Sequence, residues 1–552
     1  MTGRETSTPE RSPTRNAPAS QLEHRVALGA LVFGALLFAV VSLSYPHGRD
    51  QATHGYIGLR WLEGRIPYRD TFDIKPPGVF FAHTVAYAVF GKSMLALRAL
   101  DLLVSVLPTG LVLAFATLPK HAVHAARTRH VARVTAFHAL TYFGTFDYWC
   151  TGQSETWCCV VASVAIHSAV TESRNTWART AFVQGLALGG MLLFKPPAVV
   201  LVLACIAFVL HAQRPRDRSL GAWFRHVSAF GAVSAAGAAL LVLPVVAYFA
   251  LHRSLGAMFD VLVVTTARYA KTGSSAASLV DSIGEIFMMF ATFNGLPLLL
   301  LAGAVVRLKN AGTHESSRRR YRLGLMVFAG AVVAVGAQRK FFLYHWVLAV
   351  PALTFLAGSA LADLHETIGI NSPERRSLPT QIAVLALVLL LVGGDGTDNV
   401  LRVATLLPEL ASTRKLEALD PAFVDPGHYH VNEYRTIARH VARVSSPNDD
   451  VLVRGFEPQI YLLAGRRYHG RHFWSLFVSG SVFSQPERFR DEDCRAFLSA
   501  PPKVVVAFNS DRPPIEAGPT YERMGYRKVA DVSVFVVLER NGSLPLPETC
   551  PW

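Results

Sequence analysis

The stretch RDQATHGYIGLRWLEGRIPYRDTFDIKPPG, residues 49–78, is a long polar segment that directly follows an apolar one. Charged side chains and histidine occur along it, two tyrosines and a tryptophan lie among them, and it ends in Pro-Pro-Gly. The apolar run before it, residues 26–45, is long enough for one bilayer crossing, which takes roughly 20 residues. Long polar segments at such a place are usually functional rather than connective, so we expect functional residues here.

The composition indicates a membrane protein. Of the 552 residues, 51% are hydrophobic and only 17% are charged, and the mean hydropathy is +0.30. The formal net charge of +15 would also suit a nucleic-acid-binding protein. The basic residues, however, lie mainly in short loops between apolar runs, which is the pattern of membrane topology and argues against a nucleic-acid partner.

Apolar runs predict about eleven membrane crossings and one helix that lies along the membrane surface. The expected spans are residues 26–45, 95–118, 131–149, 156–171, 178–194, 197–212, 227–251, 283–306, 322–337, 343–362 and 379–394. Residues 75–91 are apolar but short; if they crossed, the basic loop 120–133 and every later basic loop would change sides. We therefore expect an interfacial helix there, with Pro76 in its first turn, where a missing N–H costs nothing.

The basic loops place the N-terminus in the cytoplasm by the positive-inside rule. The segments expected on the opposite, outer face are residues 46–75, 146–157, the corner at Lys195, 252–281 and 338–345. These segments hold most of the conspicuous polar and aromatic residues. An active or binding site is therefore expected on the outer face.

The pattern predicts three regions. Residues 1–23 are polar and are expected to form a disordered cytoplasmic tail. Residues 24–394 form the transmembrane domain, with an outer catalytic loop at 46–91. Residues 395–552 alternate short β-branched runs with helical stretches, which predicts a small extracytoplasmic α/β domain. Cys494 and Cys550 lie in it, either as a disulfide or as two unpaired cysteines, and no His/Cys spacing suggests zinc.

Carboxylates near the outer ends of apolar segments are candidates for proton transfer. Asp50 and Asp73 stand near the two ends of the 49–78 stretch. A lone interfacial aspartate is usually just solvated, but a loop anchored at both ends can hold a general base in place. Glu155 lies near the hydrocarbon, where a charge is costly, so it either lines a site or reaches out to water.

Two Lys-Pro-Pro triplets begin at Lys75 and Lys195. A proline pair keeps the preceding residue extended and starts a helix, so each lysine is held off the helix at the surface. They are either two independent helix starts or two cations aimed at one anion. Further cationic and aromatic residues of the outer rim are Arg339, Lys340, Tyr344 and His345. Cations on the disfavoured side of a membrane suggest an anionic ligand such as a lipid phosphate.

Several motifs resemble those of the GT-C superfamily of polytopic glycosyltransferases. The similarity is to bacterial relatives of dolichyl-phosphate-mannose protein mannosyltransferases, among them the enzymes that add aminoarabinose or galacturonic acid to lipopolysaccharide. The motifs are GRDQ (48–51), YIG (56–58), WLEG (61–64), PYRDTFDIKPPG (67–78), the Phe-Gly pair 90–91 followed by Arg98, Glu155, FFLYHW (341–346) and VRGFEPQIYLLAGRRY (453–468).

This resemblance implies transfer of one sugar, with inversion, from a polyprenyl-phosphate carrier to a lipid, glycan or protein acceptor at the outer face of a bacterial inner membrane. Asp50 matches the catalytic aspartate of the first loop, which acts on the acceptor hydroxyl, and Lys75 matches the lysine that holds the donor phosphate. The further substrate-binding candidates are Arg49, Asp73, Glu155, Lys195, Arg339, Lys340, Tyr344 and His345. The family often has Asp-Glu where this chain has Asp50-Gln51, so we assign no metal ligand and leave a divalent metal open.

Two other classes of protein compete with this hypothesis. A transporter or flippase of a lipid-linked or anionic envelope precursor typically shows two related halves and charged, discontinuous helices at mid-membrane. We see no repeat, and the charges gather at the outer rim. A scaffold whose outer domain alone is functional would not need about eleven spans for an anchor.

Overall fold

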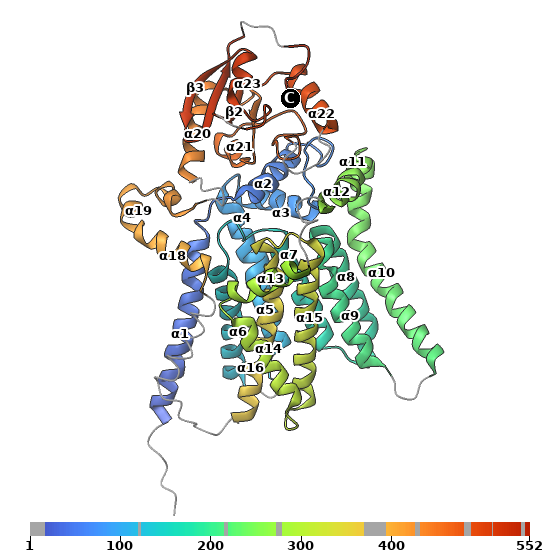
Figure 1. Cartoon of the computed structure of the whole chain (residues 1–552). Helices are drawn as coiled ribbons and strands as arrows, with labels where there is room; N and C mark the ends of the chain where they lie inside the picture. Colours follow the sequence, from blue (N-terminus) through green and yellow to red (C-terminus); the bar gives the residue numbers. More distant parts are fainter. Residues whose placement is uncertain are drawn as a thin grey trace, which may run out of the picture.

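The structure is a computed structural model that describes residues 17–119, 123–214, 219–271, 279–368, 393–424, 431–479, 487–509, 512–542 and 547–552. A bundle of long helices carries a smaller mixed domain on one end (Figure 1). Two shorter helices lie across that end, between the bundle and the domain. The predicted combination of a helical bundle that contains several apolar helices with a small C-terminal α/β unit is thus present.

Hydropathy located most of the bundle helices correctly. They are α1 (Ala17–Ser42), α4 (Met94–Leu100), η1 (Asp101–Val106), α5 (Leu107–Ala116), α6 (His124–Thr145), α7 (Ser154–Val170), α8 (Trp177–Phe194), α9 (Val199–Gln213), α10 (Leu220–Leu251), α14 (Leu296–Lys309), α15 (Glu315–Gln338) and α16 (Val350–Ile368). Within the described ranges, five helices are long and apolar enough to cross a membrane, or six if one bent pair counts as a span. The expected span at 379–394 lies almost wholly outside the described residues.

Two helices differ from the expected bounds. Helix α1 begins at Ala17, inside the stretch 1–23 that was expected to be disordered, and Pro18 stands in its first turn, where proline is tolerated. The expected span 283–306 is broken into α13 (Leu279–Thr292) and α14, which meet at 97°. The break falls at Asn294-Gly295, whose φ angles of 49° and 78° are left-handed and end the helix.

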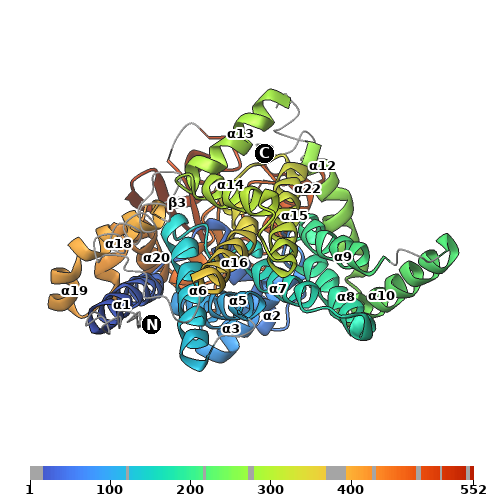
Figure 2. The same ribbon diagram turned by 90° about the horizontal axis from the view of Figure 1, so that it is seen from below.

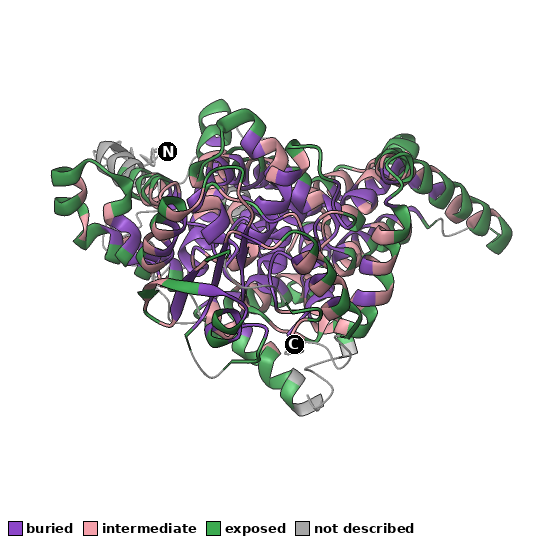
Figure 3. Cartoon of the chain, turned by 90° about the horizontal axis from the view of Figure 1, so that it is seen from above, coloured by how far each residue is buried: buried purple, intermediate pink, exposed green. Residues whose placement is uncertain are grey.

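The outer helices of the bundle are exposed although they are apolar. Only 17% of the most apolar window of α10 is buried, and α10 projects from one side of the bundle while α1 stands at the other (Figure 2). Buried residues gather in the middle of the molecule (Figure 3). An apolar helix with an open flank is what a lipid surrounding requires.

The polar stretch 49–78 forms α2 (Arg49–Leu62) and leads into α3 (Pro77–Phe90), and both lie across the end of the bundle (Figure 1). A helix does start at the Pro-Pro pair, but its first residue is Pro77, and Pro76 is the extended N-cap rather than part of the first turn as predicted. The two helices cross closely at Gly58, where a Cβ atom would lie 2.9 Å from the Thr84 nitrogen. The arrangement agrees with an interfacial helix at 75–91 rather than a span.

The C-terminal domain contains a four-stranded sheet of order β1-β2-β4-β3. Strand β1 (Val451–Val453) is parallel to β2 (Val504–Phe508), while β4 (Phe535–Arg540) is antiparallel to both β2 and β3 (Tyr526–Val532). The helices of this part of the chain are α18 (Asp395–Thr405), α19 (Leu407–Thr413), η6 (Leu416–Ala422), α20 (Val431–Val444), α21 (Gln459–Ala464), α22 (Glu487–Ser499) and α23 (Gly518–Arg523).

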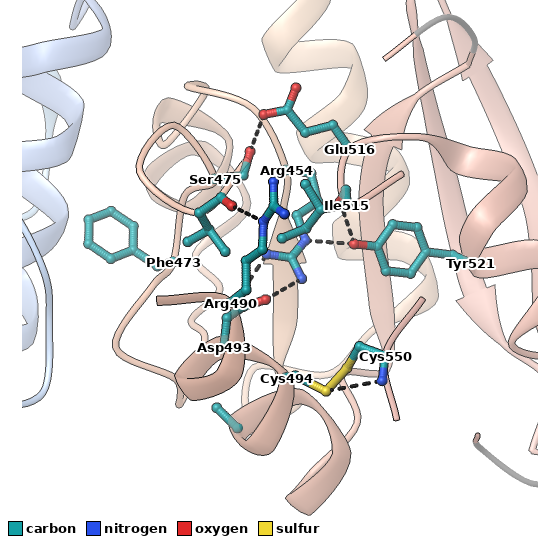
Figure 4. A network of polar contacts seen from close by, with 12 residues as sticks. Arg454, Phe473, Ser475, Arg490, Asp493, Cys494, Ile515, Glu516, Tyr521 and Cys550 are labelled. Atoms are coloured by element: carbon teal, nitrogen blue, oxygen red, sulfur yellow. Dashed lines mark hydrogen bonds and ion pairs between the residues drawn. A yellow bond between two sulfur atoms is a disulfide. The ribbon is translucent and has the colours of Figure 1, made fainter. Parts of the chain in front are cut away.

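A buried arginine and a disulfide hold this domain together (Figure 4). Arg454 is fully buried and donates to both carboxylate oxygens of Asp493 and to the hydroxyl of Tyr521. Cys494 and Cys550 are bonded, which decides between the two alternatives that the sequence left open. The bond attaches the end of the chain to α22.

The domain and the two crossing helices share one hydrophobic core. The ring of Tyr56 in α2 lies 4.3 Å from that of Phe473 and 4.8 Å from that of Tyr461. On the other flank, Arg488 of α22 pairs at 3.0 Å with Asp260, at the start of η4 (Asp260–Thr265), which lies between α11 (Leu255–Phe259) and α12 (Thr266–Lys271). The C-terminal domain therefore covers the residues that were expected to be functional.

Candidate functional site

The segments expected on one face of the membrane do lie at one end of the bundle, under the C-terminal domain (Figure 1). Four of them converge: the stretch 46–75, the turn 146–157 before α7, the corner between α8 and α9, and the chain from Arg339 into η5 (Leu343–Ala349). The candidate site is the polar cluster at this convergence.

The two Lys-Pro-Pro lysines meet at one tyrosine. Lys195 is extended, with φ −157° and ψ 90°, because α8 has ended and the following prolines start a 3-10 turn, η3 (Pro196–Ala198). Lys75 similarly precedes the extended Pro76. The ammonium nitrogen of Lys195 lies 5.9 Å from the ring centre of Tyr344, and that of Lys75 lies 5.3 Å from it. The two triplets are thus not independent helix starts in space.

Glu155 is fully buried and faces the second lysine. Its Oε1 lies 2.7 Å from the Lys195 nitrogen and 3.7 Å from Nε2 of His345. Burial lowers the pKa of Lys195, and the adjacent carboxylate opposes that effect. Glu155 does not reach out to water, which was one of the two interpretations of its position.

Asp73 and Lys75 form the second charged part of the cluster. Burial raises the pKa of Asp73 to about 7, against the opposing charge of Lys75 and with a further contribution from Asp50. Burial disfavours the charge of Lys75, but Asp50, Glu155 and Asp73 outweigh it and raise its pKa. A carboxyl that titrates near neutrality beside a firmly charged lysine is suited to proton transfer.

Asp50 lies in the first turn of α2, half-buried, where the helix dipole favours a negative charge. The side-chain amide of Gln153 donates to its Oδ2 at 3.4 Å and to the carbonyl of Trp149 at 3.0 Å. Asp50 therefore lies against the turn before α7, and its charge also acts on Lys75.

Arg98 is a structural residue of the site whose role the sequence did not reveal. It is 1% exposed and donates to the backbone carbonyls of Tyr45, Pro46, Tyr148 and Thr151. These carbonyls belong to the segment before α2 and to the turn before α7, so one guanidinium joins them. An arginine inside an apolar run was the available signal.

The remaining candidates lie around the cluster rather than in it. Arg49 pairs at 3.3 Å with the buried Glu457 of the C-terminal domain. Lys340 lies 4.4 Å from the ring centre of Tyr269. Arg339 is exposed at the end of α15, with a left-handed φ of 51°. Over the described parts of the chain, no group of three or more His, Cys, Asp or Glu residues is arranged to hold a metal ion.

No protein-family model matches the chain, and no curated protein matches its sequence. Its structure is similar to the crystal structure of ArnT from Cupriavidus metallidurans bound to undecaprenyl phosphate, with a TM-score of 0.53 over 94% of this chain and 99% of that one.

The chain has a GT-C-like fold. The sequence identity is 16%, so this similarity concerns the fold and not the individual residues of the site. The fold implied by the GRDQ and Lys-Pro-Pro motifs is confirmed at this level, whereas a specific relative is not shown.

Proposed function

We propose that the protein is a membrane glycosyltransferase that moves a single sugar from a polyprenyl-phosphate donor to an acceptor at the outer face of a bacterial inner membrane. The observation that supports this most is the approach of Lys75 and Lys195 to the same tyrosine, beside the carboxylates of Asp50 and Asp73. The undecaprenyl phosphate bound to the structurally similar ArnT agrees with a lipid phosphate as ligand.

The lysines would act on the donor. In a sugar–phosphate–lipid donor the linking phosphate carries one charge, and a second charge develops on it as the bond to the sugar breaks. Lys75, with Lys195 next to it, would stabilise that new charge more in the transition state than in the bound donor, which is the condition for catalysis. Tyr344 and His345 would contribute to the same donor site, with Arg339 and Lys340 at its rim.

Asp50 would act on the acceptor as general base. It takes the proton of the acceptor hydroxyl while the oxygen attacks the anomeric carbon and the bond to the phosphate oxygen breaks. One displacement of this kind inverts the configuration at that carbon. Asp73, which titrates near pH 7, lies close enough to Lys75 to tune the charge of the donor site.

The outer location that we propose for the site fits a lipid-linked donor. Nucleotide sugars are intracellular, so a site on the outer face needs a sugar delivered by a lipid. In this arrangement the N-terminus is cytoplasmic and the domain 395–552 is extracytoplasmic. The acceptor is a lipid, a glycan or a protein, and no nucleic acid takes part.

The test is sugar transfer from a defined polyprenyl-phosphate-sugar in membranes, with products identified by mass spectrometry. We expect Asp50→Asn to lower the rate by about 10²–10⁴, the usual contribution of a general base. Lys75→Met should lower it by about 10²–10³. Matched controls are Asp531→Asn and Lys528→Met, an exposed ion pair on β3 of the sheet. Wild-type rates in both site variants would overturn the proposal.

A transporter remains the second candidate, because the bend between α13 and α14 is a discontinuous helix of the kind that transporters use. Uptake of a lipid-linked or anionic envelope precursor into sealed vesicles, without any sugar transfer, would favour it.

A further inference from the structure

Gln51 follows the proposed base in α2, and its side chain is fully buried against the turn before α7. Its amide nitrogen lies 3.1, 2.9 and 2.7 Å from the backbone carbonyl oxygens of Tyr148, Trp149 and Thr151. One NH₂ group thus faces three acceptors. The turn is some 100 residues away along the chain, so this is a tertiary contact.

Only a donor fits this position. A carboxylate of the same shape would set its oxygens against three carbonyl oxygens, with no proton to share among them. Gly48 lets the helix come this close, because a Cβ atom there would lie 2.8 Å from the Trp149 Cβ atom. The glycine before Asp50 and the glutamine after it therefore belong to one tight junction.

The same turn carries Gln153, which reaches the proposed base. Gln153 shares the Trp149 carbonyl with Gln51 and donates to Oδ2 of Asp50. Arg98 holds the Tyr148 and Thr151 carbonyls as well. The position of the Gln153 amide thus depends on a turn that is fixed by two buried donors.

We propose that Gln51 is a positioning residue: its amide fixes the turn 148–153 so that Gln153 holds one carboxylate oxygen of Asp50 and orients the base toward the acceptor. Where the family often has a glutamate, this chain has the neutral amide of Gln51. This amide acts on Asp50 indirectly, through the backbone of the turn and Gln153. The experiments below that measure sugar transfer rest on the proposed function. The thiol-labelling experiment does not.

The first experiment is the pH dependence of Gln51→Glu. An ionised glutamate cannot donate, whereas a protonated one can give its O–H to one of the carbonyls. Burial and the three carbonyls raise the pKa of such a carboxyl. We expect the variant to lose at least about tenfold in rate at pH 8 and to regain activity toward pH 6. The other ionisable groups nearby include Asp50, Arg98, Asp147 and Cys150, and a new carboxylate interacts with them; the profile of Gln51→Glu is therefore compared with those of the wild type and of Gln51→Leu, which keep these groups and lack the new one.

A second pair of variants tests whether Gln51 acts through Gln153. Gln51→Leu should lose activity at every pH, and adding Gln153→Leu should lower the rate little further, because both changes break the same link. Gln184→Glu is the matched control: this buried glutamine donates at 2.9 Å to the Ala165 carbonyl, between α8 and α7. Its rate per folded protein should show no new pH dependence.

Thiol labelling gives a readout that needs no sugar transfer. Cys150 is buried within the turn, whereas Cys158, Cys159 and Cys205 are buried in helices. Gln51→Leu should speed the alkylation of Cys150 and leave the other three unchanged, and Gln184→Leu should not speed it. If Asp50→Asn is inactive but Gln51→Glu transfers sugar at the wild-type rate at pH 8, the positioning role is overturned. If the wild type transfers no sugar, the proposed function fails, and unchanged Cys150 labelling in Gln51→Leu would overturn the fixed turn independently.

Discussion

The buried pair of Glu155 and Lys195 allows stability and activity to be separated. The perturbation is Glu155→Leu, Lys195→Met and the combination of both. At 2.7 Å the pair attracts by about 6 kcal/mol with an effective dielectric constant of about 20. Desolvation cancels much of that attraction. Removing one partner should nevertheless lower the free energy of unfolding by about 3–5 kcal/mol, because the other charge stays buried without its closest partner.

Replacing both charges by apolar side chains of similar size removes the stranded charge. We therefore expect each single variant to be strongly destabilised and the double variant to recover most of the lost free energy. Lys195 is also a proposed ligand of the donor phosphate, so the double variant should stay inactive although it is stable. The next assay separates these two properties.

Thermal unfolding of the purified protein, followed together with transfer of a radiolabelled sugar in the same samples, measures both quantities. If the double variant loses as much free energy of unfolding as the two single variants together, the carboxylate and the ammonium are not coupled, and the reasoning is refuted. A stable and fully active double variant would remove Lys195 from the site.

Three further predictions concern the surroundings of the site. Burial raises the pKa of Asp73 from 3.8 to about 7 in the folded protein, so folding favours its protonated form and this group makes the protein lose stability as the pH rises from about 4 to 7; relative to Asp73→Asn, the wild type should therefore lose more stability over this range, as chemical denaturation of both proteins at several pH values would reveal. Arg98→Leu removes one donor from four buried carbonyls, of which those of Tyr45 and Pro46 are not also reached by Gln51, and it should lower the melting temperature far more than Arg133→Leu, a substitution at a half-buried arginine of α6. Glu457→Gln removes the charge that faces Arg49 and should speed amide hydrogen exchange in α21 but not in α7. An equal increase of the exchange rate in both helices would contradict a local role of this contact.

Local sequence rules predicted the parts of the site, but not how they combine. Each Lys-Pro-Pro triplet fixes its own corner, and hydropathy puts both corners on one side of the membrane. Their approach to Tyr344 depends on how the bundle helices pack, which no short stretch encodes. The sequence showed Gln51 only as a departure from a motif. Its partners are backbone carbonyls, which every residue has, so no residue type in the sequence identifies them.

The errors have equally local causes. Hydropathy averages over side chains and does not register backbone conformation, so it passed over the turn at Asn294-Gly295, although this dipeptide is a strong turn signal. The disulfide stayed open because two cysteines alone do not reveal their distance. The assignment of 24–394 and 395–552 as separate domains stays a prediction, and the shared core shows that their surfaces are continuous.

That shared core has a consequence for biosynthesis. The hydroxyl of Tyr56 in α2 accepts the backbone N–H of Tyr468 and donates to its carbonyl, across 412 positions of the chain. The helix that holds Asp50 is made early by the ribosome, yet its apolar cover is made last. The proposed site therefore stays unfinished until the final domain has been synthesised and folded, and a chain that stops short of this domain would carry every proposed catalytic residue and still lack an ordered site.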